Sequence, residues 1–322
     1  MIAALRKAAP ASRIDVAVTR AGPRELFENL TGWVDGVAYL PYWEKGRAAF
    51  VAALLRERRR PQYDFVFLAY PAYRPEYQVL ARAFRARRRF AHRYGRPSLR
   101  NLLWLNSDLV PVEQKHNVLR NMHLLAAAGI PALPPEGYLA PAHWVAPAHE
   151  RAPRTVAVHV GTIKHDGLDA KRWPLEKFVL VCRSLIESGL DVTLVMGPDE
   201  RPETQFVHSQ VPATRIYEGT LADVARFLST CGAVLTNDSG IGHLAAAVRA
   251  PVVSLFGPTP LEYAPFGPSA IALRPTDCPP CFEATRLDMS CKLGIDYACL
   301  KRDLPVGLVV ETLTNLTLAR HA

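Results

Sequence analysis

The residues best suited to chemistry lie in DSGIGH, positions 238–243, where an acid, a hydroxyl, two glycines and a histidine occur together. The segment lies between strand-like apolar runs at 233–237 and 251–257. Parallel α/β sheets bind ligands at the carboxyl ends of their strands, and this segment directly follows such a run. The helix that begins here has unpaired N–H groups at the positive end of its dipole. The pattern therefore predicts an anion site, most simply for a phosphate.

The residues of this segment have separate expected roles. Asp238 would repel a phosphate, so we expect it to bind sugar hydroxyls or to cap the helix. His243 lies in the first turn and can donate a hydrogen bond to a phosphate oxygen. The alternative is a purely structural helix cap, since Asp or Ser followed by Gly is common at helix starts. The backbone donors expected to point at the phosphate belong to Ser239, Gly240, Ile241 and Gly242, and the two glycines let an anion approach because they carry no side chain.

Strand-like and helix-like segments alternate along most of the chain, which predicts parallel βαβ units. Residues 131–153 contain six prolines and no sustained periodicity, so the domain boundary is placed there. We expect two doubly wound, Rossmann-like domains that face a cleft, at 1–140 and 141–322. The expected strands are 13–19, 34–40, 63–70, 155–161, 191–197, 233–237 and 251–257. The expected helices are 23–30, 45–59, 116–130, 173–189, 220–231, 240–248 and 305–318.

The charge of the chain is strongly basic, with 39 Lys and Arg against 30 Asp and Glu, a net +9. This suits an anionic partner. Much of the excess lies at 54–60 and 81–100, either as a solvated helix face or as a patch for anionic lipid or an anionic acceptor. No zinc-finger, homeodomain or RNP pattern accompanies it, so no nucleic-acid partner is expected. No apolar run approaches the ~20 residues of a membrane span, and a cytoplasmic location is expected.

Four of the six cysteines crowd into residues 278–299 with the spacing C-x₂-C-x₉-C-x₇-C. Four thiolates can complete a tetrahedral structural site for zinc or iron, and C-x₂-C supplies two ligands from one turn. Reduced buried thiols and disulfides are the alternatives, although disulfides are rare in the cytoplasm. The candidate ligands are Cys278, Cys281, Cys291 and Cys299.

The longer segment NDSGIGHLAAAVRAPVVSLFGPT, at 237–259, resembles the signature of glycosyltransferase family 9, the ADP-heptose:lipopolysaccharide heptosyltransferases. That signature reads D-[TS]-G-x-x-H-x-A-A, followed by Pro and [LVY]-[FY]-G-P-T. The stretch GTIKHDGLDAKRWPLEKF, at 161–178, resembles a second family segment with K-x-W-P near its end. GPDE at 197–200 is a weaker match. Together these segments extend the resemblance over most of the chain. The sequence contains no P-loop motif and no complete dinucleotide-binding fingerprint.

The resemblance implies a GT-B fold and an inverting, metal-independent sugar transfer with no required cofactor. The donor would be ADP-activated, usually ADP-heptose, and the acceptor a lipopolysaccharide core or related cell-envelope glycan at the inner membrane face. The N-terminal domain would serve the acceptor and the C-terminal domain the donor. Lys171 would neutralise leaving-group charge and Asp238 would contact the heptose. The donor phosphates and ribose would be held by Thr162, Glu200, Ser239, Gly240 and His243.

The resemblance also raises a difficulty at the N-terminus. In this family the general base is an Asp in a glycine-rich loop after the very first strand. The opening MIAALRKAAP resembles the helix that follows that loop, so the N-terminal domain is expected to lack its first strand and its base. Either that segment lies upstream, or the protein is an impaired or non-catalytic nucleotide-sugar-binding homologue. A GT-B sugar-nucleotide epimerase is a further alternative, since an Asp-Ser-Gly loop occurs there too.

Overall fold

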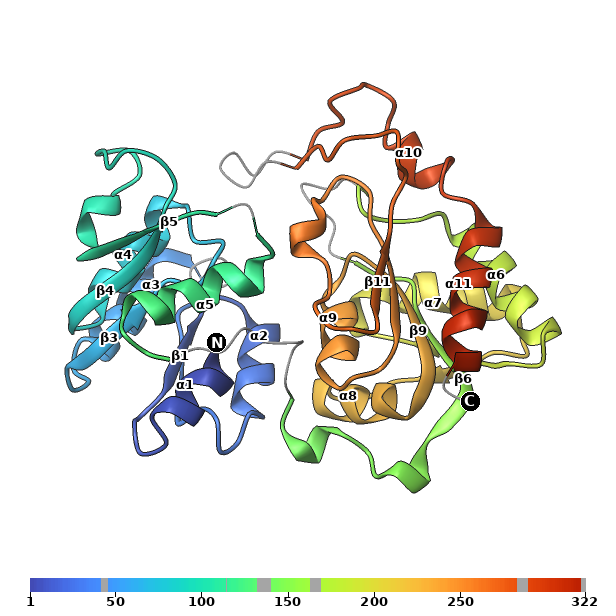
Figure 1. Cartoon of the computed structure of the whole chain (residues 1–322), viewed down its shortest axis with the longest axis horizontal. Coiled ribbons are helices and arrows are strands. Elements are labelled where there is room, and N and C mark those ends of the chain that lie inside the picture. The colour runs from blue at the N-terminus through green and yellow to red at the C-terminus, as the bar shows by residue number, and fades with distance from the viewer. Residues whose placement is uncertain (42–45, 114, 132–139, 163–168, 283–288, 320–322) are drawn as a thin grey trace. The chain divides into compact units, whose positions relative to one another are not determined.

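The computed structural model describes residues 1–41, 46–113, 115–131, 140–162, 169–282 and 289–319 (Figure 1). The chain divides into two compact units, Met1–Pro135 and Glu136–Glu283 with Leu287–Ala322. Each unit combines helices with parallel strands. In the described ranges, no helix is both long enough and apolar enough to cross a membrane.

The second unit is built on a parallel sheet of six strands in the order β11-β10-β9-β6-β7-β8. From β6, the strands β7 and β8 are added on one side of the sheet. The strands β9, β10 and β11 are then added on the other side of β6, so the strand order reverses between β6 and β9. Such a switch point is where doubly wound sheets bind ligands. The strands are β6 (Ala152–His159), β7 (Asp191–Val195), β8 (Arg215–Tyr217), β9 (Cys231–Asn237), β10 (Val252–Leu255) and β11 (Ala270–Leu273).

Helices cover both faces of this sheet, with α6, α7 and α11 on one face and α8 and α9 on the other (Figure 1). Their ends follow from local sequence. At the start of α8, Thr220 and Asp223 form a reciprocal capping box. After α6, Gly189 adopts a positive φ of 77° that closes the helix. The helices are α6 (Leu175–Glu187), α7 (Arg201–Gln210), α8 (Leu221–Thr230), α9 (Gly240–Ala247), α10 (Ala298–Lys301) and α11 (Val306–Ala319).

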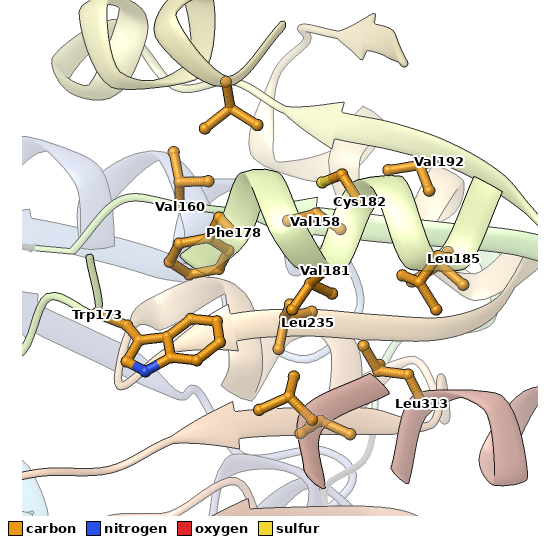
Figure 2. Packing of buried hydrophobic residues seen from close by; sticks show 14 of the residues in the cluster. Val158, Val160, Trp173, Phe178, Val181, Cys182, Leu185, Val192, Leu235 and Leu313 are labelled. Carbon is orange, nitrogen blue, oxygen red and sulfur yellow. The ribbon is translucent and has the colours of Figure 1, made fainter. Parts of the chain in front are cut away.

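The core of the second unit lies between α6 and the sheet, as Figure 2 shows. Phe178 and Leu185 of α6 are fully buried, and Trp173 just before the helix is 1% exposed. Full burial of such side chains stabilises a fold by about 1.5–3 kcal/mol each. The ring of Trp173 meets that of Phe178 edge to face, at 5.3 Å between centroids. This packing fixes the chain immediately after Lys171, which matters for the site described below.

The first unit contains two separate parallel sheets, β1-β2 and β3-β4-β5. Its first described element is α1, a helix as the sequence suggested, and the expectation that a strand is missing before it stays a prediction. The strands are β1 (Asp15–Val18), β2 (Gly36–Tyr39), β3 (Tyr63–Phe67), β4 (Ala86–Arg93) and β5 (Asp108–Pro111). The helices are α1 (Ile2–Ala8), α2 (Ala21–Glu28), α3 (Gly46–Glu57), α4 (Pro75–Ala83) and α5 (Asn117–Ala127).

One of the two interpretations of the basic segment 81–100 is wrong. The basic segment 81–100 is not a helix face, because its middle forms β4, in which Phe90 and His92 are buried. Arg88 of this strand pairs with Asp108 of β5 at 2.5 Å, so part of the positive charge is used between strands. Strand β3 is only partly buried, since Phe65 is 38% exposed.

Candidate functional site

Two loops meet at the switch point of the second unit, one after β6 and one after β9. The Thr162 hydroxyl donates a hydrogen bond to the backbone carbonyl of Asp238 at 2.7 Å. Both residues are buried, with exposed fractions of 4% and 7%. The structure thus brings together two residues that lie 76 positions apart, as expected for the carboxyl ends of neighbouring parallel strands.

Asn237 joins a third segment, the one that contains Trp173, to the end of β6. Its side-chain amide donates to the Val160 carbonyl at 2.8 Å, and its Oδ1 accepts the Trp173 backbone N–H at 3.1 Å. The residue is completely buried, so these bonds replace the water that a buried amide would otherwise need. Asn237 therefore fixes the backbone next to Lys171, a role that the sequence analysis missed.

Lys171 and Asp238 form an ion pair, with 2.6 Å between Lys171 Nζ and Asp238 Oδ2. Their side chains are 15% and 8% exposed, so solvent screens this pair weakly. Asp238 therefore contacts a cation rather than the amides of α9. The structure places an ammonium group and a carboxylate side by side at the site where the sequence predicted one of each.

The N-terminus of α9 carries no side-chain cap. Ser239 occupies the N-cap position with extended backbone angles, yet its hydroxyl accepts no backbone N–H of the helix. Instead its Oγ lies 2.7 Å from the Thr236 hydroxyl. A serine at this position usually accepts an N–H of the first turn, so α9 departs from the normal arrangement. The Ser239 hydroxyl therefore does not cap the helix, and the first amides remain open to another acceptor.

The two glycines of this turn have different environments. A Cβ on Gly240 would lie in open space, with no atom within 4 Å. A Cβ on Gly242 would lie 2.8 Å from Ser254 Oγ and 3.0 Å from Thr236 Cγ2. The N–H of Gly242 already donates to the Ser239 carbonyl at 3.2 Å. Gly240 is thus the glycine open to a ligand, whereas Gly242 allows α9 to pack closely on β9 and β10.

The other residues of the turn also fit an anion at this end of the helix. Ile241 is half-buried, and its N–H belongs to the first turn, where amides lack intrahelical acceptors. His243 lies in the same turn, is half-buried and already has an interaction partner in the structure. Lys171 Nζ, paired with Asp238, places an ammonium group next to this turn.

Glu200 lies against the backbone at the ends of β6 and β7. An ideal Cβ on Gly161 would be 1.9 Å from Glu200 Cγ, and one on Gly197 would be 2.4 Å from Glu200 Oε2. Burial raises the pKa of the Glu200 carboxyl, and the nearby Asp199 carboxylate adds to the effect. The carboxylate is therefore held next to the loop that carries Thr162.

We expect Gly161→Ala to displace the Glu200 side chain and to weaken nucleotide binding as much as Glu200→Ala does. The reason is that the added methyl group and Glu200 Cγ cannot occupy the same space. Calorimetric titration with ADP checks this in the two single variants and in the double variant. A double variant that binds much more weakly than Glu200→Ala alone would show that Gly161 acts independently of Glu200. Gly267→Ala is the matched control, because a Cβ there meets no atom within 4 Å.

Arg172 was not predicted as a site residue, although it lies beside Lys171. Its guanidinium donates to the Thr162 carbonyl at 2.9 Å and pairs with Glu203 of α7. Its side chain is 14% exposed. Arg172 therefore links the loop after β6 to the helix that follows Glu200, and no local sequence signal separates it from a solvated arginine.

His159, at the end of β6, gives this unit a dependence on pH. Burial lowers the pKa of His159 from 6.5 to about 4, and the Arg172 charge acts in the same direction. The unfolded chain therefore takes up a proton near pH 6.5 while the folded chain does not. Above this pH we expect His159 to leave the free energy of unfolding unchanged. Between the two pKa values its contribution should lower that free energy by about 1.4 kcal/mol per pH unit.

Urea denaturation across this range tests the role of His159. The variant His159→Asn keeps a donor near the Val195 carbonyl, which His159 Nδ1 contacts at 3.2 Å, and removes the titration. This variant should reduce the slope of unfolding free energy against pH by the contribution of one histidine. The contribution of His92 should remain, because burial also lowers the pKa of His92 to about 4. The exposed His149→Asn is the control. An unchanged slope in His159→Asn would contradict the assignment.

The four clustered cysteines are reduced in the structure, and all but the half-buried Cys291 are buried. Burial raises the pKa of Cys299 to about 11, and its contact with the Cys278 thiol acts in the same direction. Throughout the described ranges, no group of three or more His, Cys, Asp or Glu side chains is arranged to hold a metal ion. Zinc or iron binding by these four cysteines stays a prediction.

Solved structures share the fold of this chain. A glycosyltransferase family 9 protein from Veillonella parvula superposes with a TM-score of 0.77 at 20% identity, covering 99% of this chain and 92% of the other. The Escherichia coli heptosyltransferase WaaC, solved with ADP, gives a TM-score of 0.71 at 18% identity and covers 98% and 93%. These likenesses define the class: an α/β protein of the GT-B fold, as predicted.

Sequence comparison narrows the class to a family. The model of glycosyltransferase family 9 (heptosyltransferase) matches residues 51–290, and the chain belongs to that family. Lipooligosaccharide heptosyltransferase 2 of Haemophilus influenzae is 32% identical over 103 residues, 30% of each chain. Lipopolysaccharide heptosyltransferase 3 of Escherichia coli is 29% identical over 226 residues, 65% of this chain and 63% of its own length. The matched segments thus span from about a third to under two thirds of these relatives.

Proposed function

We propose that the protein transfers heptose from an ADP-activated donor to a lipopolysaccharide-core or related anionic glycan of the cell envelope. The observation that carries the proposal is the uncapped start of α9 beside the Lys171–Asp238 pair, at the switch point of the second unit. Cleavage of the bond between sugar and diphosphate releases a strongly anionic leaving group. Without a metal, protein groups must offset that charge, and preorganised amides and cations do this effectively.

Each residue of the site has a role in this proposal. The amides of Ser239, Gly240 and Ile241, together with His243, bind the diphosphate. Lys171 leaves Asp238 to offset the charge of the departing phosphate, while Asp238 accepts hydrogen bonds from the heptose. Thr162 lies by the phosphates and Glu200 binds the ribose hydroxyls. Of the four amides first considered, that of Gly242 is assigned to the helix rather than to the donor.

The first unit is assigned to the acceptor, and contact with the inner face of the membrane would bring it to a lipid-linked glycan. The general base is not assigned to any residue of this chain. A homologue that binds the donor without transferring it is therefore the second candidate, whereas family membership disfavours the epimerase. A transfer assay separates the transferase from the donor-binding homologue. It compares the purified protein with a version that carries additional residues before Met1.

A panel of nucleotide sugars tests the donor class. We expect ADP-sugars to raise the melting temperature of the purified protein, because Glu200, the amides of α9 and Lys171 together recognise the nucleoside diphosphate. UDP- and GDP-sugars share the ribose and the diphosphate, so a smaller effect of these donors would locate the preference for ADP in contacts with the adenine base. Equal indifference to all three would overturn the proposal, and stabilisation by ADP-sugars without transfer would leave the binding homologue.

A further inference from the structure

The loop between β4 and β5, Tyr94–Asn106, is part of the first unit (Figure 1). It carries two large apolar side chains that are exposed to solvent. Leu99 is 84% exposed and Trp104 is 55% exposed. Leu99 exposes a larger fraction than any other large apolar side chain in the described ranges. Isolated exposed leucines are common, but a leucine and a tryptophan on one short loop suggest contact with a partner.

The loop is held in one conformation by its own hydrogen bonds. Asn101 Oδ1 accepts the N–H groups of Ser98, at 2.9 Å, and Leu103, at 3.3 Å. Its amide donates to the Arg96 carbonyl at 2.8 Å. Leu103 is fully buried and anchors the loop in the first unit. Leu99 is therefore held outward by a folded loop, which costs hydrophobic free energy unless something covers it.

The charge of the loop identifies the chemistry of that partner. Arg93, Arg96 and Arg100 are exposed, and no acidic residue occurs between Arg93 and Asn106. Across the described parts of the chain, none of these three arginines has an ion-pair partner. Tryptophan and leucine flanked by arginine are typical of surfaces that enter the headgroup region of an anionic bilayer.

We propose that the loop Tyr94–Asn106 docks on an anionic lipid bilayer, with Leu99 and Trp104 inserted among the headgroups and the arginines paired with lipid phosphates. The loop begins where β4 ends, at the carboxyl edge of the three-stranded sheet, so docking brings that edge to the membrane surface. The proposal adds a docking surface to the proposed function, and it does not depend on sugar transfer.

Vesicle flotation with the full chain tests the proposal. We expect binding to vesicles that contain phosphatidylglycerol, little binding to pure phosphatidylcholine, and release by added salt. The variants Leu99→Ser/Trp104→Ser and Arg96→Gln/Arg100→Gln should each lower the affinity for phosphatidylglycerol vesicles, by on the order of 10- to 100-fold. Trp104 should also shift its fluorescence to the blue on binding, and Trp104→Phe should remove that shift.

The other basic segment supplies matched controls. Leu55, on α3, is 58% exposed, and Arg58 and Arg59 follow it on the surface. Leu55→Ser and Arg58→Gln/Arg59→Gln should leave vesicle binding unchanged. A wild-type protein that ignores anionic vesicles, as expected if a protein partner covers the loop, would overturn the proposal. So would loss of binding in the controls but not in the loop variants. Stabilisation by ADP-sugars would be unaffected in either case.

Discussion

Replacing Lys171 with alanine is expected to lower the rate of sugar transfer by on the order of 10²–10³-fold. The ammonium group lies 2.6 Å from Asp238 Oδ2, beside the uncapped amides of α9, so it is placed to meet the charge that develops on the leaving phosphate. A steady-state assay with an ADP-heptose donor measures the effect. Because the charge develops as the bond breaks, the loss should appear mainly in kcat rather than in KM.

The stability of the same variant needs a control, because Lys171→Ala also leaves a buried carboxylate without its cation. Removal of one partner from a buried pair costs about 3–5 kcal/mol of unfolding free energy, and the partial exposure of Lys171 and Asp238 places this pair at the lower end. In the double variant Lys171→Ala/Asp238→Asn, the neutral amide should recover much of that stability without recovering transfer. If transfer returned together with stability, Lys171 would be a structural residue and the assigned role would be wrong.

Replacing Gly240 with valine is expected to reduce ADP affinity by about 10- to 100-fold, the equivalent of losing one hydrogen bond to a charged group. The open space around its Cβ position means that the apo protein should tolerate the new side chain. Valine and glycine have similarly low helix propensities, so the unfolding free energy should change by less than about 0.5 kcal/mol. Calorimetric titration and urea denaturation of the same sample separate the two effects.

Gly242→Ala is the matched comparison within the same helix turn. Its Cβ would meet Ser254 Oγ at 2.8 Å and Thr236 Cγ2 at 3.0 Å, so we expect about 1–3 kcal/mol of lost stability from overpacking. If Gly240→Val destabilised the protein as much as Gly242→Ala and kept its ADP affinity, the open face of Gly240 would have no role in binding.

The sequence predicted the second unit well because its signals are local. The segment before Asn237 is a short apolar run, and the helix after Ser239 begins at a glycine. The apolar residues of α6 recur at helical spacing. Neighbouring parallel strands place their carboxyl ends at one edge, so a strand–turn–helix pattern is enough to bring Thr162 and Asp238 together. Recognition of the family supplied the remaining expectation, that Lys171 lies there too.

The residues that sequence analysis missed act through long-range contacts. Asn237 was read as part of a strand, yet its amide joins Val160 and Trp173. The strand β4 was read as a basic helix face because its arginines outnumber its apolar residues. Its pairing with β5, including the ion pair between Arg88 and Asp108, is visible only once the two strands are adjacent. Burial and pairing of this kind override local propensity.

A nuclear magnetic resonance titration of the backbone amides with ADP tests whether the start of α9 binds the diphosphate. We expect large, saturable shifts for the amide signals of Ser239, Gly240 and Ile241, and only small shifts at the other end of α9, at Ala246. Loss of these shifts in Gly240→Val should parallel the loss of affinity. Saturable ADP binding that leaves the three amides unmoved, with the large shifts elsewhere in the chain, would contradict the account.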